Sequence, residues 1–268
     1  MRWLLGLAVT ALLVGASPVQ AADIPAPVWK AYRTSIKTAS SKDRDPVVHN
    51  LVQLKKSDPR VRWRSIDGRR HVLVATVRRD PVSDVARGEA FDLRSAKWVV
   101  VPRQLRQRCV RIGCRSMGPR RLDLTIKQFI GLPPDGDYRL ANTFWARPRD
   151  IFRPCLQPSV RASSCPRRAR GPLPTINGTS VRTFLRDQAE YAWRWPRRWN
   201  PATAVSCSGA FPEPRNCYGF PWTELGYTYD WAPNRSHIGL SEFVVTAGSR
   251  VYLNRVQSQR AFLARGRR

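Results

Sequence analysis

Six cysteines that fall into three close pairs constrain the fold of this chain more than any other feature of its sequence. The pairs are Cys109 with Cys114, Cys155 with Cys165, and Cys207 with Cys217. An even number of cysteines in an exported chain favours disulfides over free thiols. The short spacing within each pair predicts three local bridges. Each would close a short loop and stabilise the fold by about 2–3 kcal/mol through loop entropy.

Zinc binding is the alternative use of these cysteines. A structural zinc site commonly contains a Cys-x-x-Cys motif, and that motif is absent from the sequence. The three histidines, His49, His71 and His237, have no closely paired cysteine. We therefore predict disulfides and no metal site. We also predict no cofactor, since no phosphate-binding or dinucleotide-binding glycine motif occurs.

The N-terminus has the parts of a secretory signal peptide. Met1 and Arg2 give a short positive start, residues 3–14 are mostly apolar, and residues 19–21 suit a signal peptidase. The apolar run is shorter than the roughly 20 residues of a membrane-spanning helix, so cleavage after Ala21 is favoured over a retained anchor. We expect a chain exported to the periplasm or the extracellular space, without a transmembrane segment after removal of the signal peptide.

The charge of the chain is strongly positive, with a formal net value of +28. Arginine dominates, because only 7 of the 47 cationic residues are lysine. A field of this size attracts nucleic acid, anionic lipid headgroups or acidic cell-wall polymers. The arginines are spread along the chain and not confined to one patch, which also fits a compositional bias in an ordinary exported protein. Both interpretations remain open.

Patterns of apolar and polar residues predict a chain of strands, loops and a few helices. Strands are expected over residues 61–66, 71–77, 97–101, 139–146, 226–231, 241–245 and 250–253. Asp67 and Gly68 supply the turn of a hairpin between the first two strands, in a loop of about four residues. Helices are expected over residues 46–56, 122–131 and 180–193, and a Gly-containing loop over residues 109–119.

A hairpin, isolated strands and few helices favour an α+β fold. We expect a mostly antiparallel sheet with a few short helices and disulfide-stapled loops. The chain divides into a signal peptide (1–21), an N-terminal arm with a short helix (22–58), a single α+β domain (59–254) and a basic C-terminal tail (255–268).

Six segments stand out by their amino-acid sequences and by the order in which they occur. They are VRWRSIDGRRHVLVAT (61–76), KWVVVPRQL (97–105), LTIKQFIGLPP (124–134), FWARPRDIFRPC (144–155), YGFPWTELGYTYDW (218–231) and HIGLSEFVV (237–245). Together they resemble an uncharacterised family of exported bacterial proteins, with FRPC and GYTYDW as the most distinctive parts. The resemblance implies a grouping and no activity. Such proteins tend to be acidic after the FRPC cysteine, whereas this chain continues LQPSVR (156–161), so an acidic ligand site is not expected there.

His237, Asp230 and Glu242 are the candidate catalytic residues, with Glu224 close to them in sequence. A histidine beside a carboxylate can act as a general acid and base, and a basic surface would suit a phosphodiester substrate. The alternative is structural: the carboxylates pair with arginines and His237 lies in a loop. A serine hydrolase is not indicated, because the sequence has no G-x-S-x-G motif.

The stretch after residue 192 is the candidate binding segment. It contains Trp193, Arg194, Trp195, Arg197, Arg198 and Trp199. Tryptophan rings and arginine planes favour interfaces, carbohydrate faces and stacked bases. If these side chains are buried instead, they close the core after a helix, with arginine stems covering the rings.

Two functions from different classes follow. The first is a non-catalytic exported protein whose basic, tryptophan-bearing surface contacts anionic envelope polymers or lipid headgroups. The second is a secreted hydrolase, such as a nuclease acting on nucleic acid, that uses His237 with Asp230 or Glu242. Convergence of the histidine and a carboxylate in an open cleft would favour the second.

Overall fold

The computed structural model describes residues 24–39, 46–199 and 219–264, and for residues 193–199 it describes the backbone alone. The helices are α1 (Ala26–Ala39), α2 (Pro102–Arg111), α3 (Pro119–Phe129), α4 (Val181–Trp199) and α5 (Gln259–Ala264), with short 3₁₀ turns η2 (Cys114–Ser116) and η3 (Pro148–Asp150). The first six strands are β1 (Trp63–Ile66), β2 (Arg69–Arg78), β3 (Ala90–Asp92), β4 (Lys97–Val100), β5 (Leu140–Ala146) and β6 (Ile151–Phe152). They are followed by β7 (Thr175–Ile176), β8 (Thr179–Ser180), β9 (Tyr227–Tyr229), β10 (Ile238–Val245) and β11 (Arg250–Ser258).

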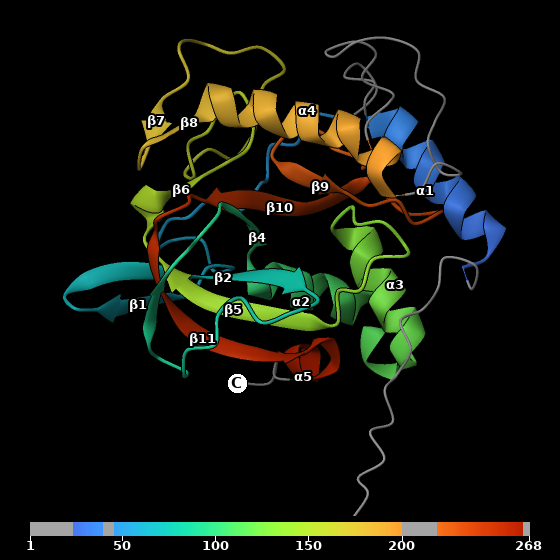
Figure 1. Cartoon of the computed structure of the whole chain (residues 1–268), viewed down its shortest axis with the longest axis horizontal. Coiled ribbons are helices and arrows are strands. Elements are labelled where there is room, and N and C mark those ends of the chain that lie inside the picture. The colour runs from blue at the N-terminus through green and yellow to red at the C-terminus, as the bar shows by residue number, and fades with distance from the viewer. Residues whose placement is uncertain (1–23, 40–45, 200–218, 265–268) are drawn as a thin grey trace, which may run out of the picture.

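One antiparallel sheet organises the described part of the chain (Figure 1). Its strand order is β3-β11-β5-β2-β4-β10-β6, with β1 paired to β2 and β9 paired to β10, and β7 and β8 form a separate small hairpin. The strand pairs are antiparallel. The chain is therefore an α+β protein with a mostly antiparallel sheet, as predicted.

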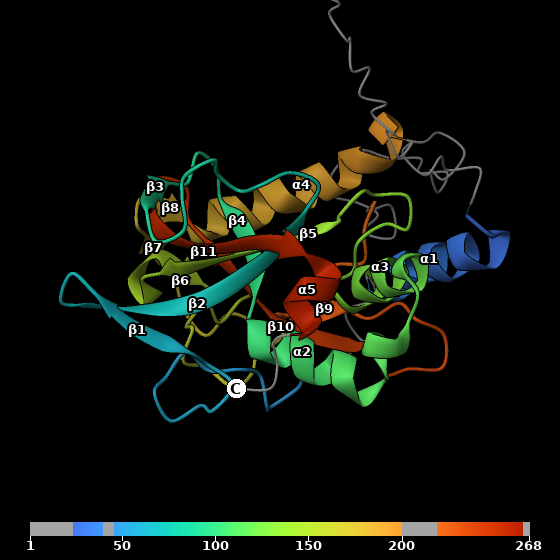
Figure 2. The same cartoon turned by 90° about the horizontal axis from the view of Figure 1, so that it is seen from below.

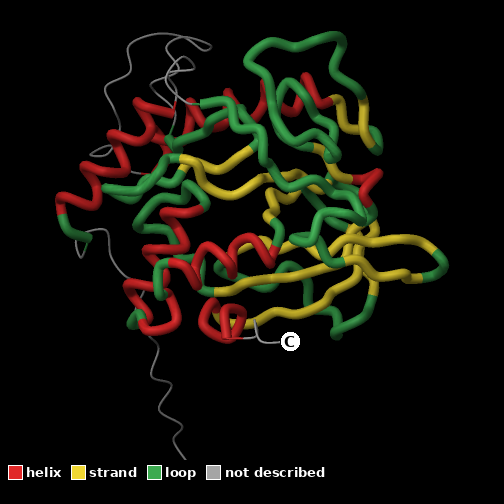
Figure 3. The backbone as a smooth tube through the Cα atoms, turned by 180° about the vertical axis from the view of Figure 1, so that it is seen from behind, coloured by secondary structure: helices red, strands yellow, loops and turns green. Residues whose placement is uncertain are grey.

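The β1–β2 hairpin turns in two residues and not in the loop of about four expected from the sequence. Ile66 pairs with Arg69, so Asp67 and Gly68 alone form the turn. Their φ angles are 51° and 69°, and two positive φ values match the twist of the flanking strands. The hairpin extends beyond the rest of the sheet (Figures 1 and 3).

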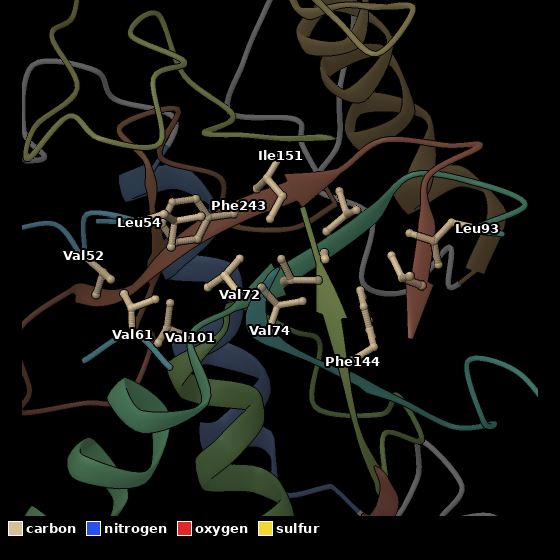
Figure 4. Close-up of a cluster of buried hydrophobic side chains, with 14 residues drawn as sticks. Val52, Leu54, Val61, Val72, Val74, Leu93, Val101, Phe144, Ile151 and Phe243 are labelled. Atoms are coloured by element: carbon tan, nitrogen blue, oxygen red, sulfur yellow. The ribbon is translucent and has the colours of Figure 1, made fainter. Parts of the chain in front are cut away.

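Both faces of the sheet are covered. Successive side chains point to opposite faces, so Val72 and Val74 of β2 lie on one face, and Ala75 and Val77 lie on the other. The first face packs against loop segments in a cluster of aliphatic and phenylalanine side chains (Figure 4). The second face is covered by α2, α3 and α5, which lie together in Figure 2, and by α4.

The helix predicted over residues 46–56 is wrong. The segment is extended, and the amide of Leu51 donates to the carbonyl of Ser163 at 3.0 Å. The amide of Val52 donates to the hydroxyl of Ser241 at 2.8 Å. The apolar residues of this segment have helical spacing, but they do not pack as one helix face. Leu51 packs against the loop that contains Cys155 and Cys165, whereas Val52 and Leu54 pack in the core beneath the sheet.

The loop predicted over residues 109–119 is also wrong in part, because the helix α2 was missed. Pro102 stands at its first turn, where the missing amide proton costs nothing. Leu105 and Cys109, one helical turn apart, are its buried face. The chain then turns through η2 and enters α3, which begins three residues before the helix predicted from residue 122.

The predicted tail from residue 255 begins inside the fold. Residues 255–258 end β11, and α5 follows. Phe262 and Leu263 are buried beside α2 and α3, so apolar packing orders a segment that its charges marked as a tail. Residues 265–268 lie outside the described part of the chain.

Helices α1 and α4 agree better with the sequence. Residues 26–39 form α1 within the predicted N-terminal arm (22–58), and Tyr32 and Ile36 lie on its buried face. α4 begins at Val181, as expected, and continues to Trp199. Tyr32 and Ile36 pack against Trp231 and other aromatic residues near the end of α4.

Two of the three predicted disulfides are present. They join Cys109 to Cys114 and Cys155 to Cys165. Cys207 and Cys217 lie outside the described residues, as does the predicted signal peptide. None of the helices within the described ranges is long and apolar enough to cross a membrane.

Candidate functional site

Asp230 is fixed by ion pairs inside the protein. Its side chain is buried, and its two carboxylate oxygens lie 2.7 Å from Arg108 Nη2 and 3.1 Å from Arg235 Nη2. The amide of Ala232 donates to it at 3.0 Å. Both carboxylate oxygens are therefore occupied by guanidinium donors of the fold and are not free to contact a substrate.

His237 does not contact a carboxylate among the described residues. Its Nδ1 lies 3.3 Å from the backbone carbonyl oxygen of Asp230. Its ring stacks on Tyr229, with the centroids 4.8 Å apart and the planes 18° from parallel. The side chain is exposed, in the loop position that the structural alternative expects.

Glu242 lies farther along the same strand. It pairs with Val100 of β4, deep in the sheet. Five positions separate it from His237, and a strand rises about 3.3 Å per residue, so the two lie roughly 15 Å apart. The structure therefore does not bring His237, Asp230 and Glu242 together. Glu224 lies in the turn before β9, with a φ of 55°.

The carboxyl group of Glu242 is buried, and one of its oxygens has no partner in the described part of the chain. The side chain is 4% exposed, and its Oε1 has no hydrogen-bond partner among the described residues. Burial raises the pKa of Glu242 from 4.5 to about 8, although the charge of Arg153 acts in the opposite direction. At neutral pH this carboxyl group is protonated and can donate one hydrogen bond.

Glu242 lines a cavity of about 300 Å³ on the helix-covered face of the sheet. Strands β2, β4 and β10 form the floor, and α4 and the segments around residues 130–138 and 220–222 form the walls. Aromatic side chains contribute much of the lining: Trp98, Tyr138, Tyr191, Phe220 and Trp222. Sequence patterns could not indicate this cavity, because its lining comes from segments far apart in the chain.

The FRPC and GYTYDW stretches contact each other inside the fold. Arg153 is fully buried and donates to the carbonyl oxygens of Gly226 at 3.1 Å, Val52 at 2.6 Å and Ala162 at 3.2 Å. Gly226 has a φ of 77°, and a Cβ there would lie 2.5 Å from Arg153 Cδ. These contacts explain the two distinctive stretches by packing and hydrogen bonding, without a ligand.

The predicted tryptophan and arginine segment is the C-terminal end of α4. The backbone of residues 193–199 is helical, and the side chains of Trp193, Arg194, Trp195, Arg197, Arg198 and Trp199 lie outside what is described. Tyr191, just before them, is 44% exposed. The binding role of this segment stays a prediction.

Four arginines lie on or beside the β1–β2 hairpin. Arg62 precedes β1, Arg64 lies on it, and Arg69 and Arg70 begin β2. All four side chains are exposed. None of them forms an ion pair with a residue of the described ranges. The sequence could have indicated this cluster, because charged side chains that alternate along the two strands of a short hairpin stay at the surface.

In comparisons with known proteins, no family model, curated protein or solved structure matches the chain.

Proposed function

We propose that this chain is an exported, non-catalytic protein that binds acidic polymers of the cell envelope through its arginine-rich surface. The observation that carries the proposal is the exposed cluster of Arg62, Arg64, Arg69 and Arg70 on the projecting hairpin. The charge of +28 adds a long-range attraction to any polyanion.

The carboxylates of the protein do little to weaken this attraction, because many are engaged with cations of the fold. The pairs include Asp58 with Arg60, Asp123 with Lys127, Asp137 with Arg139, and Asp230 with Arg108 and Arg235. Such pairs leave the surplus of exposed arginines to set the potential of the surface.

The hairpin presents its arginines in a fixed arrangement. Cross-strand partners share a face of the sheet, and Arg69 pairs with Ile66, two residues from Arg64. Arg64 and Arg69 therefore point the same way. Asp67, the acidic residue of the turn, accepts a hydrogen bond from the hydroxyl of Tyr252. The backbone of the hairpin therefore places two cations where one polyanion can contact both.

Export is supported by the N-terminal sequence and by the two disulfides, which persist in oxidising compartments. The hydrolase alternative gains no support, because His237 lies against a backbone carbonyl and Asp230 is held by two arginines.

Retention on heparin, a soluble acidic polysaccharide, tests the proposal. The test variant is R62Q/R64Q/R69Q/R70Q, and its matched control is R87Q/R94Q/R161Q/R182Q, which removes the same charge from exposed arginines elsewhere. We expect the hairpin variant to elute at clearly lower salt than the control. Equal elution of the two variants would refute binding through the hairpin, and flow-through of the wild type would refute polymer binding altogether.

The predicted tryptophan segment is tested in the same assay. The variant W193A/W195A/W199A keeps the charge of the chain and removes three aromatic rings. Lower retention on heparin or on anionic liposomes would add the end of α4 to the binding surface. Unchanged retention on both would refute its role.

A further inference from the structure

The cavity beside Glu242 has the features of a ligand site and lies apart from the exposed arginines. Its volume of about 300 Å³ is at the small end of the range for ligand pockets, roughly 300–1,000 Å³. Such pockets are mostly apolar with a few polar groups that orient the ligand. Tyr191 of α4 lines the cavity and is 44% exposed.

Glu242 is the one carboxylic acid among the described residues that line this cavity. Its Oε1 has no hydrogen-bond partner in the described part of the chain. Burying a polar group without a partner costs free energy, of the order of 1–3 kcal/mol. Oε1 is itself buried, so a ligand in the cavity recovers this cost when the carboxyl group rotates to present the oxygen to it.

The charge state of the carboxyl group selects the kind of ligand. Arg153 is the only described charged group that affects its pKa, and Glu242 forms no ion pair with a cation of the described residues. The other titratable groups of the lining are the phenols of Tyr138 and Tyr191, and burial raises the pKa of Tyr138 to about 12. Glu242 therefore stays protonated at neutral pH and offers an O–H donor.

The net charge and the lining exclude the charged alternatives. A chain of charge +28 repels a cationic ligand at long range. An anionic ligand would lose its hydration in an aromatic cavity whose described lining has no cationic side chain. An uncharged ligand meets neither obstacle.

We propose that the cavity binds an uncharged, largely apolar molecule with a carbonyl group, whose oxygen accepts a hydrogen bond from the carboxyl group of Glu242. The aromatic lining contacts the apolar part of the ligand, and Glu242 orients its single polar end. This proposal goes beyond polymer binding and does not depend on it.

Calorimetric titration with three probes of equal chain length tests the proposal. The probes are 2-octanone, octylamine and octanoate, each titrated into the full chain at pH 6.5 and pH 9.5. We expect 2-octanone to bind most tightly at pH 6.5. Its affinity should fall at least about tenfold by pH 9.5, because the donor proton of Glu242 is lost over this range.

Two variants separate the carboxyl group from general effects of pH. E242Q keeps an N–H donor of similar shape, so it should bind 2-octanone with an affinity that no longer depends on pH. E89Q removes an exposed carboxylate outside the cavity and should behave as the wild type.

Four results would overturn the proposal. They are no binding of any probe, tighter binding of octylamine, tighter binding of octanoate, and an affinity of the wild type for 2-octanone that is equal at the two pH values. The pH series on the wild type decides the matter even if E242Q fails to fold.

Discussion

Two buried ionisable side chains, those of Glu242 and Arg153, are expected to affect the stability of the fold more than other single residues. They differ in how their polar atoms are satisfied. Arg153 donates to three backbone carbonyls through its terminal nitrogens and leaves only its Nε without a partner among the described residues. The Oε1 of Glu242 also has no partner there. Arg153 is therefore expected to stabilise the fold, and Glu242 to reduce its stability as the pH rises from about 4.5 to about 8.

Replacing Glu242 by glutamine should remove a pH dependence of stability. The unfolded chain ionises this group near 4.5, while the folded chain keeps it protonated up to about 8. The folded state therefore binds more protons between these values, and stability falls as pH rises through this window and levels off above it. The loss is at most about 5 kcal/mol.

Urea unfolding of the wild type, E242Q and E89Q at pH 5 and pH 8 measures this effect. E242Q should gain stability relative to the wild type at pH 8 and not at pH 5, and E89Q should follow the wild type. The same fall with pH in E242Q as in the wild type would contradict the protonated state of Glu242.

Replacing Arg153 by methionine should destabilise the fold by about 3–5 kcal/mol, since three buried carbonyls lose their donor. R161M is the matched control, because Arg161 is exposed, and its effect should stay within about 0.5 kcal/mol. Urea unfolding compares them. Similar stabilities of the two variants would mean that Arg153 does not join the three segments.

At the scale of elements, the β1–β2 hairpin carries the proposed binding surface. Its two-residue turn needs positive φ at both positions, and this turn fixes which arginines share a face. Because the hairpin projects from the sheet (Figure 3), its arginines can reach an extended polymer without movement of the core.

Valine in place of Gly68 should weaken heparin binding although the charge does not change. A β-branched residue at a φ of 69° is strained by about 1–3 kcal/mol and distorts the turn. G88V is the control, because Gly88 also has a positive φ, 94°, and open space around it, but lies outside the hairpin. Equal heparin retention of G68V and G88V would show that the geometry of the turn is unimportant.

At the scale of the whole molecule, the sequence predicted what depends on neighbours in the chain. The main strands, α4 and two local disulfides follow from alternation, spacing and pairing within short segments. The extended path of residues 46–56 was missed, because its amides bond to Ser163 and Ser241, far away in sequence. The cavity was missed for the same reason, since no single segment contains it.

The candidate site was predicted less well than the fold. Residue types selected His237, Asp230 and Glu242, but no pattern in one sequence fixes whether side chains converge. Asp230 forms ion pairs with Arg108 and Arg235, as the structural alternative in the sequence analysis expects. Glu242 does not lie beside His237, so the predicted catalytic pair does not form, and the ligand role proposed for Glu242 rests on the cavity that it lines.

The salt dependence of polymer binding tests the central claim most directly. Each cation that displaces a counterion from a polyanion contributes about 0.7–0.9 to the slope of log affinity against log salt concentration. We predict that R62Q/R64Q/R69Q/R70Q lowers this slope for heparin by about 2–3 relative to the wild type. The charge-matched variant R87Q/R94Q/R161Q/R182Q should lower it by less than about 1. Equal slopes for the two variants would contradict a binding surface centred on the hairpin.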